Sequence, residues 1–467
     1  MFIGRTQELK DLDRLYGSGK FEFVVIYGRR RVGKTALIDA FLQGKKGMYC
    51  MGVESSEEQN LENLSESVTH CLTGMDLGTS FSSFQKALET VFQASMQERM
   101  VLAIDEYPYM ARASKSLASV LQRLIDQYHA SSKLMLILCG SSVSYMEDEV
   151  LAYKAPLYGR RTAQMKIMPL PFKDTACFFK EYSHEAQALM YGVTGGIPQY
   201  MLMMNPRLSV EDNIKDTYLN PISAMFEEPD NLLKQEVREA ALYNAVIQAI
   251  AEGSTKLSEI AGKVGSSTGK CANYIRTLCL LGIVKKESPY GEAHSRKIYY
   301  SVDDTMFRFW YRFIPRNMAL IMRRKADAAY RNIEPYLSDF MGPVFEKICM
   351  EYMWDQMAEG KTPLSFDDLG RWWGSDPRTR EQIEIDMMGS EGKEALLLGE
   401  CKWRNQKTDI DVLERLQWRG ALFSYPRKYL YLFSKSGFTS RCQIKAKEMG
   451  TYLISLDDMM QSWQVHV

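Results

Sequence analysis

Residues 21–42 read FEFVVIYGRRRVGKTALIDAFL, and this stretch decides the fold of the N-terminal half. Its first seven residues are mostly apolar and β-branched, as in a buried parallel strand, and its last seven have the apolar spacing of a helix. Between them lies the pattern G-x-x-x-x-G-K-T, a phosphate-binding loop at the turn from a strand into a helix. The sequence therefore predicts an α/β fold with a nucleotide site at this turn.

The residue types in this loop predict how a nucleotide is held. Glycines let backbone N–H groups surround the phosphates, the Lys34 side chain reaches the β- and γ-phosphates, and the Thr35 hydroxyl binds Mg²⁺. The N-terminus of the following helix adds a dipole that favours anions. We therefore expect a nucleoside triphosphate, ATP or GTP, together with Mg²⁺ as cofactors. The predicted nucleotide contacts are Gly28, Arg29, Arg30, Arg31, Val32, Gly33, Lys34 and Thr35.

Two further strands end in polar residues that ATP hydrolysis requires. Residues 101–106 read VLAIDE, and we predict that Asp105 holds Mg²⁺ while Glu106 polarises the attacking water. The buried strand at 134–139 leads to Ser141, which either senses the γ-phosphate or is a plain loop hydroxyl. Residues 47–53 predict one more strand, inserted between the loop and the acids, as in the additional-strand class of nucleotide-binding sheets.

Two arginines in the segment 155–162, APLYGRRT, are candidates for a catalytic role. An arginine near the γ-phosphate stabilises the charge that develops in the transition state. Arg160 or Arg161 is therefore a candidate arginine finger, and a surface salt bridge is the alternative. A finger supplied by a neighbouring copy of the chain would make the protein a homo-oligomer.

Six motifs between residues 2 and 198, together with their order along the chain, resemble those of the archaeal-type ATPases of prokaryotes, in the STAND-like branch of the AAA+-related ATPases. The resemblance covers about residues 1–235. It implies that Phe2, Ile3, Gly4 and Arg5 approach the adenine, and that residues 195–198 report the nucleotide state to the domains that follow. The motifs are FIGRTQEL at 2–9, the loop at 28–35, IDEYP at 104–108, CGSS at 139–142, PLYGR at 156–160 and GGIP at 195–198.

The middle of the chain predicts a winged helix-turn-helix, because three short helical patterns from about residue 238 precede a hairpin pattern that ends near residue 300. Residues 254–300 hold eight Lys and Arg against three Asp and Glu. We therefore predict salt-sensitive phosphate contacts with nucleic acid, DNA being favoured, and a protein-contact module is the alternative. The candidate contacts are Lys270, Arg276, Lys285, Lys286, Arg296 and Lys297.

Residues 383–402 predict a second active site on a β-hairpin. Glu400 and Lys402 share one face of a strand because side chains repeat every two positions, and Asp386 lies on the preceding strand. A metal-dependent phosphodiesterase needs carboxylates that hold Mg²⁺ or Mn²⁺ beside a lysine that positions the nucleophile and the phosphate. A solvated hairpin without chemistry is the alternative.

The hairpin resembles that of the PD-(D/E)XK nuclease superfamily, and so does the corresponding region of the archaeal-type ATPases. The resemblance implies that Glu346, on the preceding helix, is a further metal ligand and that Lys402 is the catalytic lysine. The sequence departs from the family pattern at Ile385, where a proline usually stands. A helix at 410–417 and a strand at 428–433 are expected to complete an α/β/α core of the restriction-endonuclease type.

The composition of the chain indicates its possible partners, its location and the state of its cysteines. Lys and Arg number 58 and Asp and Glu number 58, so the net charge indicates no particular partner. The sequence has neither a run of about 18 apolar residues nor the apolar core of a signal peptide, so we expect a cytoplasmic protein without membrane contact. Its nine cysteines lack metal-ligand spacing and read as reduced thiols.

These patterns together favour an ATP-switched, metal-dependent nuclease, and the alternative is an ATP-gated regulatory or scaffolding protein whose nuclease-like domain is catalytically silent. The predicted order of domains follows the motifs along the chain. It comprises a P-loop ATPase core at 1–165, a helical lid at 166–235, the winged helix-turn-helix at 236–302, a connector at 303–335 and the nuclease-like domain at 336–467.

Overall fold

The structure is a computed structural model that describes residues 2–75, 78, 80–292, 295, 297–376 and 379–464. The chain divides into two compact units. Unit 1 comprises Met1–Leu170 together with Ile197–Gln199, and unit 2 comprises Pro171–Gly196 and Tyr200–Val467.

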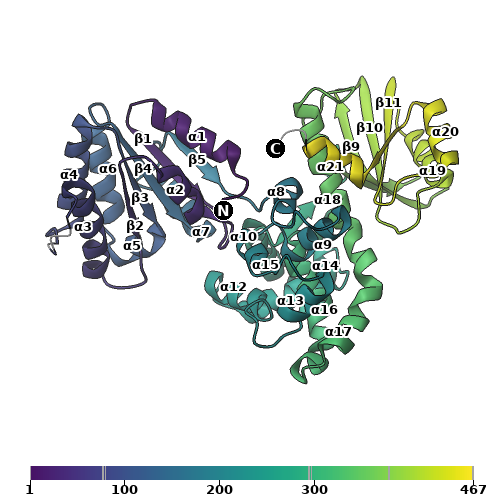
Figure 1. The fold of residues 1–467 in the computed structure, drawn as a ribbon, viewed down its shortest axis with the longest axis horizontal. Helices are drawn as coiled ribbons and strands as arrows, with labels where there is room; N and C mark the ends of the chain where they lie inside the picture. Colours follow the sequence, from purple (N-terminus) through teal and green to yellow (C-terminus); the bar gives the residue numbers. More distant parts are fainter. Residues whose placement is uncertain are drawn as a thin grey trace. The chain divides into compact units, whose positions relative to one another are not determined.

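Unit 1 is built on a five-stranded parallel sheet in the order β2–β3–β4–β1–β5 (Figure 1). The residues of β1, β3 and β4 are buried along their whole length, as expected for parallel strands with both faces covered. This sheet confirms the α/β fold predicted from the sequence. The strands are β1 (Glu22–Tyr27), β2 (Gly47–Met51), β3 (Met100–Asp105), β4 (Leu134–Gly140) and β5 (Ala163–Lys166).

The order of the strands corrects one detail of the prediction. β2 is a strand, but it lies at the edge of the sheet beyond β3. The strand inserted between β1 and β3 is β4, in which Ile137 pairs with Val24 on one side and Ala103 on the other. Neighbours in sequence are therefore not neighbours in this sheet, and the residues after β4 lie between the loop after β1 and the acids of β3.

Helices cover both faces of this sheet. Four of them bury their apolar residues in one core with Phe23, Leu102 and Leu136 of the strands. Two others lie across the sheet from these four (Figure 1). The first group comprises α3 (Glu57–Thr73), α4 (Phe84–Gln97), α5 (Tyr107–Ala113) and α6 (Leu117–Tyr128), and the second comprises α1 (Thr6–Gly17) and α2 (Lys34–Leu42); α7 (Val143–Tyr145) and the π-helix η1 (Met146–Leu151) follow β4.

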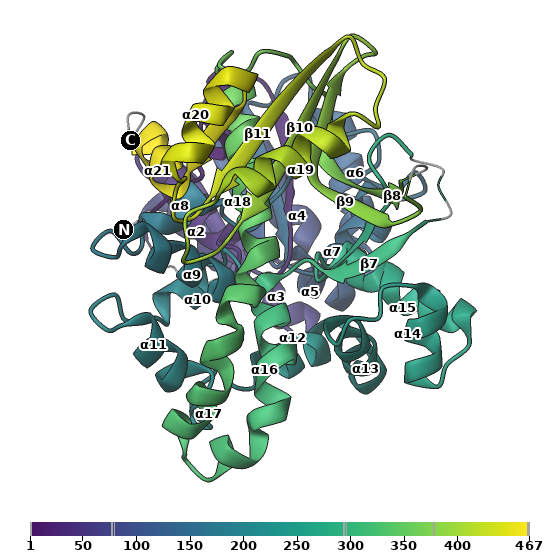
Figure 2. The ribbon, with the colours of Figure 1, turned by 90° about the vertical axis from the view of Figure 1, so that its right-hand side faces the viewer.

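Unit 2 begins with short helices that agree with the predicted lid, and three helices plus an antiparallel hairpin confirm the winged helix-turn-helix (Figure 2). The aromatic side chains of the connector are core residues, since Phe307 and Phe309 are fully buried. The elements are α8 (Phe172–Ala176), α9 (His184–Thr194), α10 (Pro198–Leu202), α11 (Val210–Thr217), α12 (Glu228–Glu236), α13 (Ala240–Ala251), α14 (Leu257–Val264), α15 (Thr268–Leu280), β6 (Val284–Glu287), β7 (Tyr299–Val302), α16 (Thr305–Met322), α17 (Ala326–Ile333) and η2 (Glu334–Tyr336).

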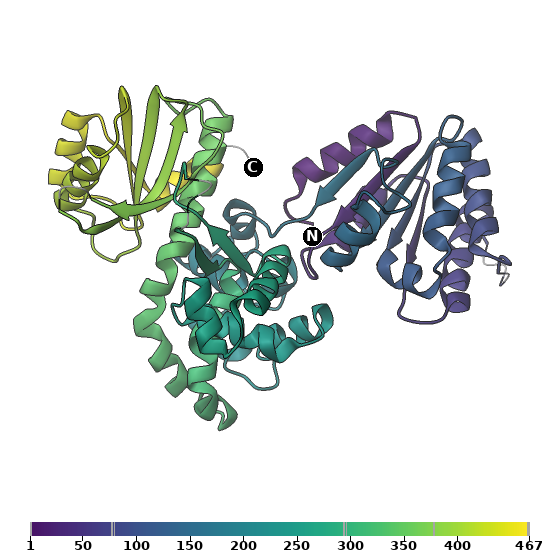
Figure 3. The ribbon, with the colours of Figure 1, turned by 180° about the vertical axis from the view of Figure 1, so that it is seen from behind.

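The C-terminal part of unit 2 holds a five-stranded mixed sheet in the order β12–β11–β10–β9–β8. β8, β9 and β10 are antiparallel, whereas β10, β11 and β12 are parallel. Figure 3 shows the sheet between α18 on one face and α19 and α20 on the other, which is the predicted α/β/α arrangement. The elements are α18 (Leu337–Ala358), β8 (Gly370–Ser375), β9 (Gln382–Glu391), β10 (Ala395–Lys402), α19 (Ile410–Gly420), β11 (Arg427–Ser434), α20 (Ser440–Met449), β12 (Tyr452–Ser455) and α21 (Leu456–Gln464).

Two compositional expectations also have structural counterparts. All nine cysteines are free thiols, so none of them takes part in a disulfide. Within the described ranges, no helix has both the length and the apolar character that crossing a bilayer requires.

Candidate functional site

The phosphate-binding loop connects β1 to α2 through a tight backbone path. Gly33 has a φ of 90°, and a side chain on Gly28 would place its Cβ 2.4 Å from the carbonyl oxygen of Ile167. Only glycine fits such a close approach between two backbones. A Cβ on Gly33 would lie 3.6 Å from the ring of Pro198, so this proline of unit 1 reaches the loop.

Two buried cations hold this loop in place. The Nζ of Lys34 donates hydrogen bonds to the carbonyl oxygens of Gly28 and Arg29, at 2.9 and 3.0 Å. The guanidinium of Arg5 donates to the carbonyl oxygen of Val32 at 3.0 Å, and Arg5 itself has a left-handed φ of 63°. The FIGR motif therefore supports the loop directly, while its implied approach to the adenine stays a prediction.

The two predicted Mg²⁺ ligands of unit 1 meet at the carboxyl end of β3. The Thr35 hydroxyl donates to Oδ2 of Asp105 at 2.6 Å, and the Tyr49 hydroxyl donates to the same oxygen at 3.0 Å. Asp105 is 1% exposed. Burial and then the charge of Asp105 raise the pKa of the Tyr49 hydroxyl, which keeps this group protonated as a donor. Two hard oxygen groups in one place fit Mg²⁺.

Glu106 and Ser141 are also brought together, at the ends of β3 and β4. The Ser141 hydroxyl donates to Oε2 of Glu106 at 2.8 Å, and its backbone N–H approaches the same oxygen at 3.3 Å. Glu106 has a left-handed φ of 48°, which turns its carboxylate out of the strand direction. The predicted base and the predicted γ-phosphate sensor therefore form one hydrogen-bonded pair.

Gly52, after β2, makes this turn possible, since a Cβ there would lie 2.5 Å from the carbonyl oxygen of Glu106. We expect Gly52→Ala to lower the free energy of unfolding by about 2 kcal/mol, the cost of overpacking, and to lower the ATPase rate because Glu106 must move. Calorimetry and a phosphate-release assay measure both effects. Gly17→Ala is the control, since a Cβ at Gly17 meets no atom within 4 Å. A Gly52→Ala protein with wild-type melting and turnover would contradict this account.

Sequence reasoning missed two tyrosines of this site. Tyr49 binds Asp105, and Tyr109 accepts a hydrogen bond of 2.8 Å from the guanidinium of Arg30 in the loop. A signal for Tyr49 existed, because it is a hydroxyl-bearing residue in the predicted strand next to the acids. Tyr109 follows the IDEYP motif by one residue, and nothing in that spacing indicates its partner.

The candidate arginine fingers have local partners within unit 1. Arg160 forms a two-pronged ion pair with Asp126 of α6, with Nε–Oδ1 and Nη2–Oδ2 distances of 2.7 Å, and this hydrogen bonding lowers the pKa of Asp126. That pair is the salt bridge named above as the alternative. The guanidinium of Arg161 lies 5.7 Å from the ring centre of Tyr158. A finger role for either residue stays a prediction.

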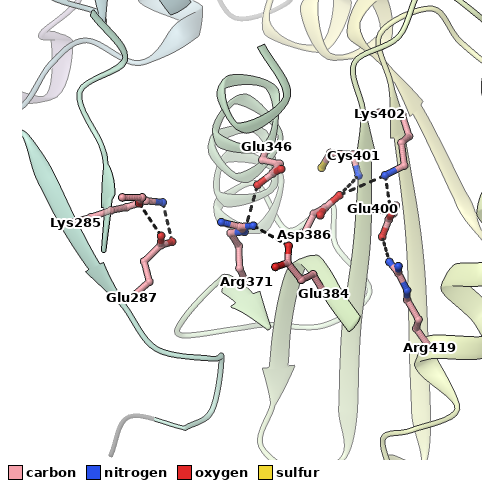
Figure 4. Close-up of polar contacts among 11 residues, drawn as sticks. Lys285, Glu287, Glu346, Arg371, Glu384, Asp386, Glu400, Cys401, Lys402 and Arg419 are labelled. Atoms are coloured by element: carbon pink, nitrogen blue, oxygen red, sulfur yellow. Dashed lines mark hydrogen bonds and ion pairs between the residues drawn. The ribbon is translucent and has the colours of Figure 1, made fainter. Parts of the chain in front are cut away.

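The second candidate site lies on the C-terminal sheet of unit 2 (Figure 4). Lys402 Nζ lies 2.6 Å from Oε1 of Glu400 and 3.9 Å from Oδ2 of Asp386. The N–H of Cys401 donates to the same Asp386 oxygen at 2.9 Å. Figure 4 shows Glu346 on α18 beside these strands. The structure thus gathers the four residues predicted for this site.

The carboxylates of this site are close enough to perturb one another. Burial, and then the charges of Glu400 and Glu346, raise the pKa of Asp386 to about 7, and Lys402 and the Cys401 N–H oppose this shift. Crowded carboxylates that resist ionisation are a common feature of functional sites. Three carboxylates supply hard oxygen donors, and this donor chemistry fits Mg²⁺ or Mn²⁺ better than Zn²⁺.

Arginines that the sequence did not indicate hold two of these carboxylates. Arg419 of α19 lies 3.0 Å from Glu400, and Arg371 of β8 lies 3.4 Å from Glu346. In the part of the chain that the structure describes, no three His, Cys, Asp or Glu side chains are arranged to hold a metal ion together. Two of the three predicted metal ligands are thus engaged in ion pairs with arginines.

The predicted nucleic-acid contacts are distributed over the winged helix. Lys270 and Arg276 are exposed on α15, and Lys286 is exposed on β6. Lys285 pairs with Glu287 at 2.8 Å, and Lys297 lies 3.8 Å from Glu292. Arg296 lies outside the described residues. The exposed positions are accessible to a phosphate backbone, whereas Lys285 and Lys297 already have carboxylate neighbours.

Comparisons with known proteins found relatives in sequence and a solved structure with a similar fold. A relative from Methanocaldococcus jannaschii, the uncharacterized protein MJECL04, is 29% identical over 97% of this chain and 98% of its own length. The uncharacterized ATP-binding protein MJ0423 of the same organism is 50% identical over 10% of this chain and 78% of its own length. The solved structure of the Walker-type ATPase PABY2304 of Pyrococcus abyssi covers 67% of this chain and 96% of its own, with a TM-score of 0.51 and 18% identity, which shows a shared fold.

Two family descriptions match separate parts of the chain. Residues 2–204 match the family described as an ATPase domain predominantly from Archaea. Residues 310–413 match DUF234, described as Archaea bacterial proteins of unknown function. With its phosphate-binding loop, its paired acids and its parallel sheet, the chain is similar to archaeal ATPase domains over residues 2–204 and to DUF234 proteins over residues 310–413.

Proposed function

We propose that this protein is an ATP-switched nuclease, in which nucleotide bound to unit 1 controls a metal-dependent phosphodiesterase site on the C-terminal sheet. The observation that carries the proposal is the convergence of Asp386, Glu400 and Lys402 on one hairpin, with Glu346 on the adjoining helix. Nucleic acid is the substrate, because exposed lysine and arginine side chains lie on the winged helix-turn-helix and can bind phosphates. DNA is favoured because a helix-turn-helix places its recognition helix in the major groove of DNA.

In the ATPase unit, Lys34 contacts the β- and γ-phosphates and the backbone N–H groups of residues 28–35 surround them. Thr35 and Asp105 hold Mg²⁺, which neutralises charge on the phosphates when it is bound. Glu106 orients and deprotonates the attacking water. Ser141, hydrogen-bonded to Glu106 at 2.8 Å, senses the γ-phosphate and holds the carboxylate ready.

In the nuclease-like site, Glu346, Asp386 and Glu400 would hold a divalent cation, which would supply Lewis acidity at the scissile phosphate. Lys402 positions the nucleophilic water and the phosphate. Its ammonium lies 2.6 Å from Glu400, so its charge is held beside the carboxylates at the end of β10. Exposed Lys270, Arg276 and Lys286 contact the phosphates of the bound strand.

Contacts inside unit 2 support a coupling route between nucleotide and nuclease-like site. The carboxylate of the half-buried Glu351 accepts hydrogen bonds from the Tyr191 hydroxyl at 2.7 Å and the Phe172 N–H at 2.8 Å. Glu351 lies on α18, the helix that carries Glu346. Tyr191 lies on α9, which leads directly into the GGIP segment, and there Gly195 and Gly196 have left-handed backbones. A change at the nucleotide would reach α18 through α9.

The decisive experiment is a cleavage assay on supercoiled plasmid, single-stranded DNA and RNA, with Mg²⁺ or Mn²⁺. It compares ATP, a non-hydrolysable analogue and no nucleotide, using wild type, Lys34→Ala and Lys402→Ala. We expect nucleotide-dependent cleavage by wild type and loss of the nucleotide response in Lys34→Ala. Absence of cleavage under every condition would overturn the nuclease proposal and leave the ATPase assignment intact.

A second candidate is an ATP-gated regulatory or scaffolding protein with a silent nuclease-like domain. The ion pairs of Arg371 with Glu346 and Arg419 with Glu400 favour this alternative, since they occupy carboxylates that a metal would need. Isothermal titration of Mn²⁺ into wild type and Asp386→Asn separates the two. Equal heats from both proteins would support the silent domain.

A further inference from the structure

The wing of the winged helix is packed against the C-terminal sheet. The wing is defined here as β6, β7 and the described residues between them, 288–292, 295, 297 and 298. At its tip, the N–H of Tyr290 donates to the carbonyl oxygen of Arg371 at 2.8 Å, and the Tyr290 hydroxyl lies 3.0 Å from the hydroxyl of Ser390. At the first residue of β7, the rings of Tyr299 and Trp373 stack with centres 4.8 Å apart and planes 8° from parallel. The wing therefore covers β8, the edge strand of the sheet.

Arg371 connects this packing to the carboxylates. Its Nε lies 3.4 Å from Glu346, and its Nη2 lies 3.2 Å from Glu384 (Figure 4). The pairing of β8 with β9 shifts register between Gly370 and Trp372, and such irregularities re-aim the side chain at that point. The backbone of Arg371 thus holds the wing while its side chain holds Glu346.

The charges around Arg371 explain why this position matters for a cation. A guanidinium stays protonated in proteins, and that of Arg371 lies 3.4 Å from Glu346 and 3.2 Å from Glu384. A positive charge fixed next to Glu346 repels a divalent cation and competes with it for the same oxygens. Arg371 is accordingly a competitor of the metal, and the wing is the element that keeps it in place.

We propose that Arg371 is a positioning residue of the nuclease-like site, and that the docked wing uses it to hold Glu346 away from the divalent cation. This inference rests on the proposed metal-dependent nuclease. Release of the wing, as when its exposed lysines turn to a nucleic acid, frees Arg371 and lets the carboxylates assemble around the metal. Substrate binding and metal loading are thereby linked.

The test is Mn²⁺ binding to the full nucleotide-free chain, followed by the electron paramagnetic resonance signal of free Mn²⁺. Binding that is lost in Asp386→Asn is assigned to the C-terminal site. We expect Arg371→Gln to bind Mn²⁺ about tenfold more tightly than wild type, because one opposing charge is removed, and Arg371→Lys to stay near wild type. Arg427→Gln, an exposed arginine on β11, is the matched control and should leave the affinity unchanged.

A second pair of variants tests the wing itself and does not depend on the stability of the Arg371 variants. The double change Tyr290→Ala and Tyr299→Ala removes the contacts that these two side chains make with the C-terminal sheet, and residue 371 remains an arginine. It should also tighten Mn²⁺ binding, by less than Arg371→Gln, and should add nothing when combined with Arg371→Gln.

The outcomes separate this inference from the proposed function. If no protein binds Mn²⁺ in an Asp386-dependent manner, the metal site itself is wrong and both proposals fail. If wild type binds Mn²⁺ but Arg371→Gln binds it equally or more weakly, the competition is wrong while the nuclease proposal stands. If the wing variants still tighten binding in the Arg371→Gln protein, the wing does not act through Arg371 and the inference is overturned.

Discussion

Replacing Glu106 with glutamine should lower the rate of ATP hydrolysis by about 10²- to 10³-fold, the usual contribution of a general base. The substitution keeps the size and the acceptor oxygen of the side chain, so the hydrogen bond from Ser141 can persist. It removes the negative charge that accepts a proton from water. ATP binding should change little, because the phosphates are held by the loop and Lys34.

Steady-state phosphate release measures the first effect, and titration with a fluorescent ATP analogue measures the second. Glu98→Gln is the matched control, since Glu98 is an exposed carboxylate that pairs with Lys46 at 2.6 Å in the same unit. A Glu106→Gln protein that hydrolyses ATP at the wild-type rate would remove the base assignment. A protein that also fails to bind ATP would show that Glu106 supports the loop instead.

Replacing Lys402 with alanine should lower metal-dependent cleavage of nucleic acid by about 10²- to 10³-fold, the cost of removing one positioned donor from a transition state. ATP hydrolysis should remain at the wild-type rate, because Lys402 lies on the C-terminal sheet and contacts Glu400 and Asp386. A loss of cleavage with unchanged ATP hydrolysis distinguishes a lysine that acts in cleavage from a residue needed for folding. Plasmid nicking and phosphate release on the same preparation measure the two rates.

Lys428→Ala serves as the control for this variant. Lys428 is exposed on β11, the strand that pairs with β10, so its loss removes the same charge from the same sheet. Equal loss of cleavage in both variants would indicate a general electrostatic contribution. Full cleavage by Lys402→Ala would exclude this lysine from the chemistry and favour a contaminating nuclease as the source of the activity.

Local motifs account for most of what the sequence predicted correctly. The strand-to-helix turn at 28–35, the strand that ends at Asp105, the winged helix and the C-terminal hairpin are fold elements that each depend on residues close together in the chain. That Glu400 and Lys402 lie on the same face of one strand follows from the two-residue repeat of side chains alone. The meeting of Thr35 with Asp105, 70 residues apart, was foreseeable because both follow parallel strands of one sheet.

What the sequence could not indicate is long-range pairing without a motif. The position of β4 between β1 and β3 depends on how crossovers pack, and strand composition is equally apolar in all three. Arg371 and Arg419 look like ordinary surface arginines, since β8 and α19 give no spacing relative to the carboxylates that they pair with. The packing of the wing on β8 rests on single aromatic residues, Tyr290 and Tyr299, whose partners lie 70 or more residues away.

The interleaved boundary of the two units limits where an ATPase domain can be separated from the rest of the chain. Three residues, Ile197–Gln199, belong to the compact body of the phosphate-binding sheet, although both flanking segments belong to the other body. The family match to the ATPase domain runs to residue 204, past this insertion, and not to the compact limit at Leu170. The matched stretch therefore includes helices of the other body, and a truncation at residue 170 would produce an ATPase domain that lacks Pro198, which lies beside the phosphate-binding loop.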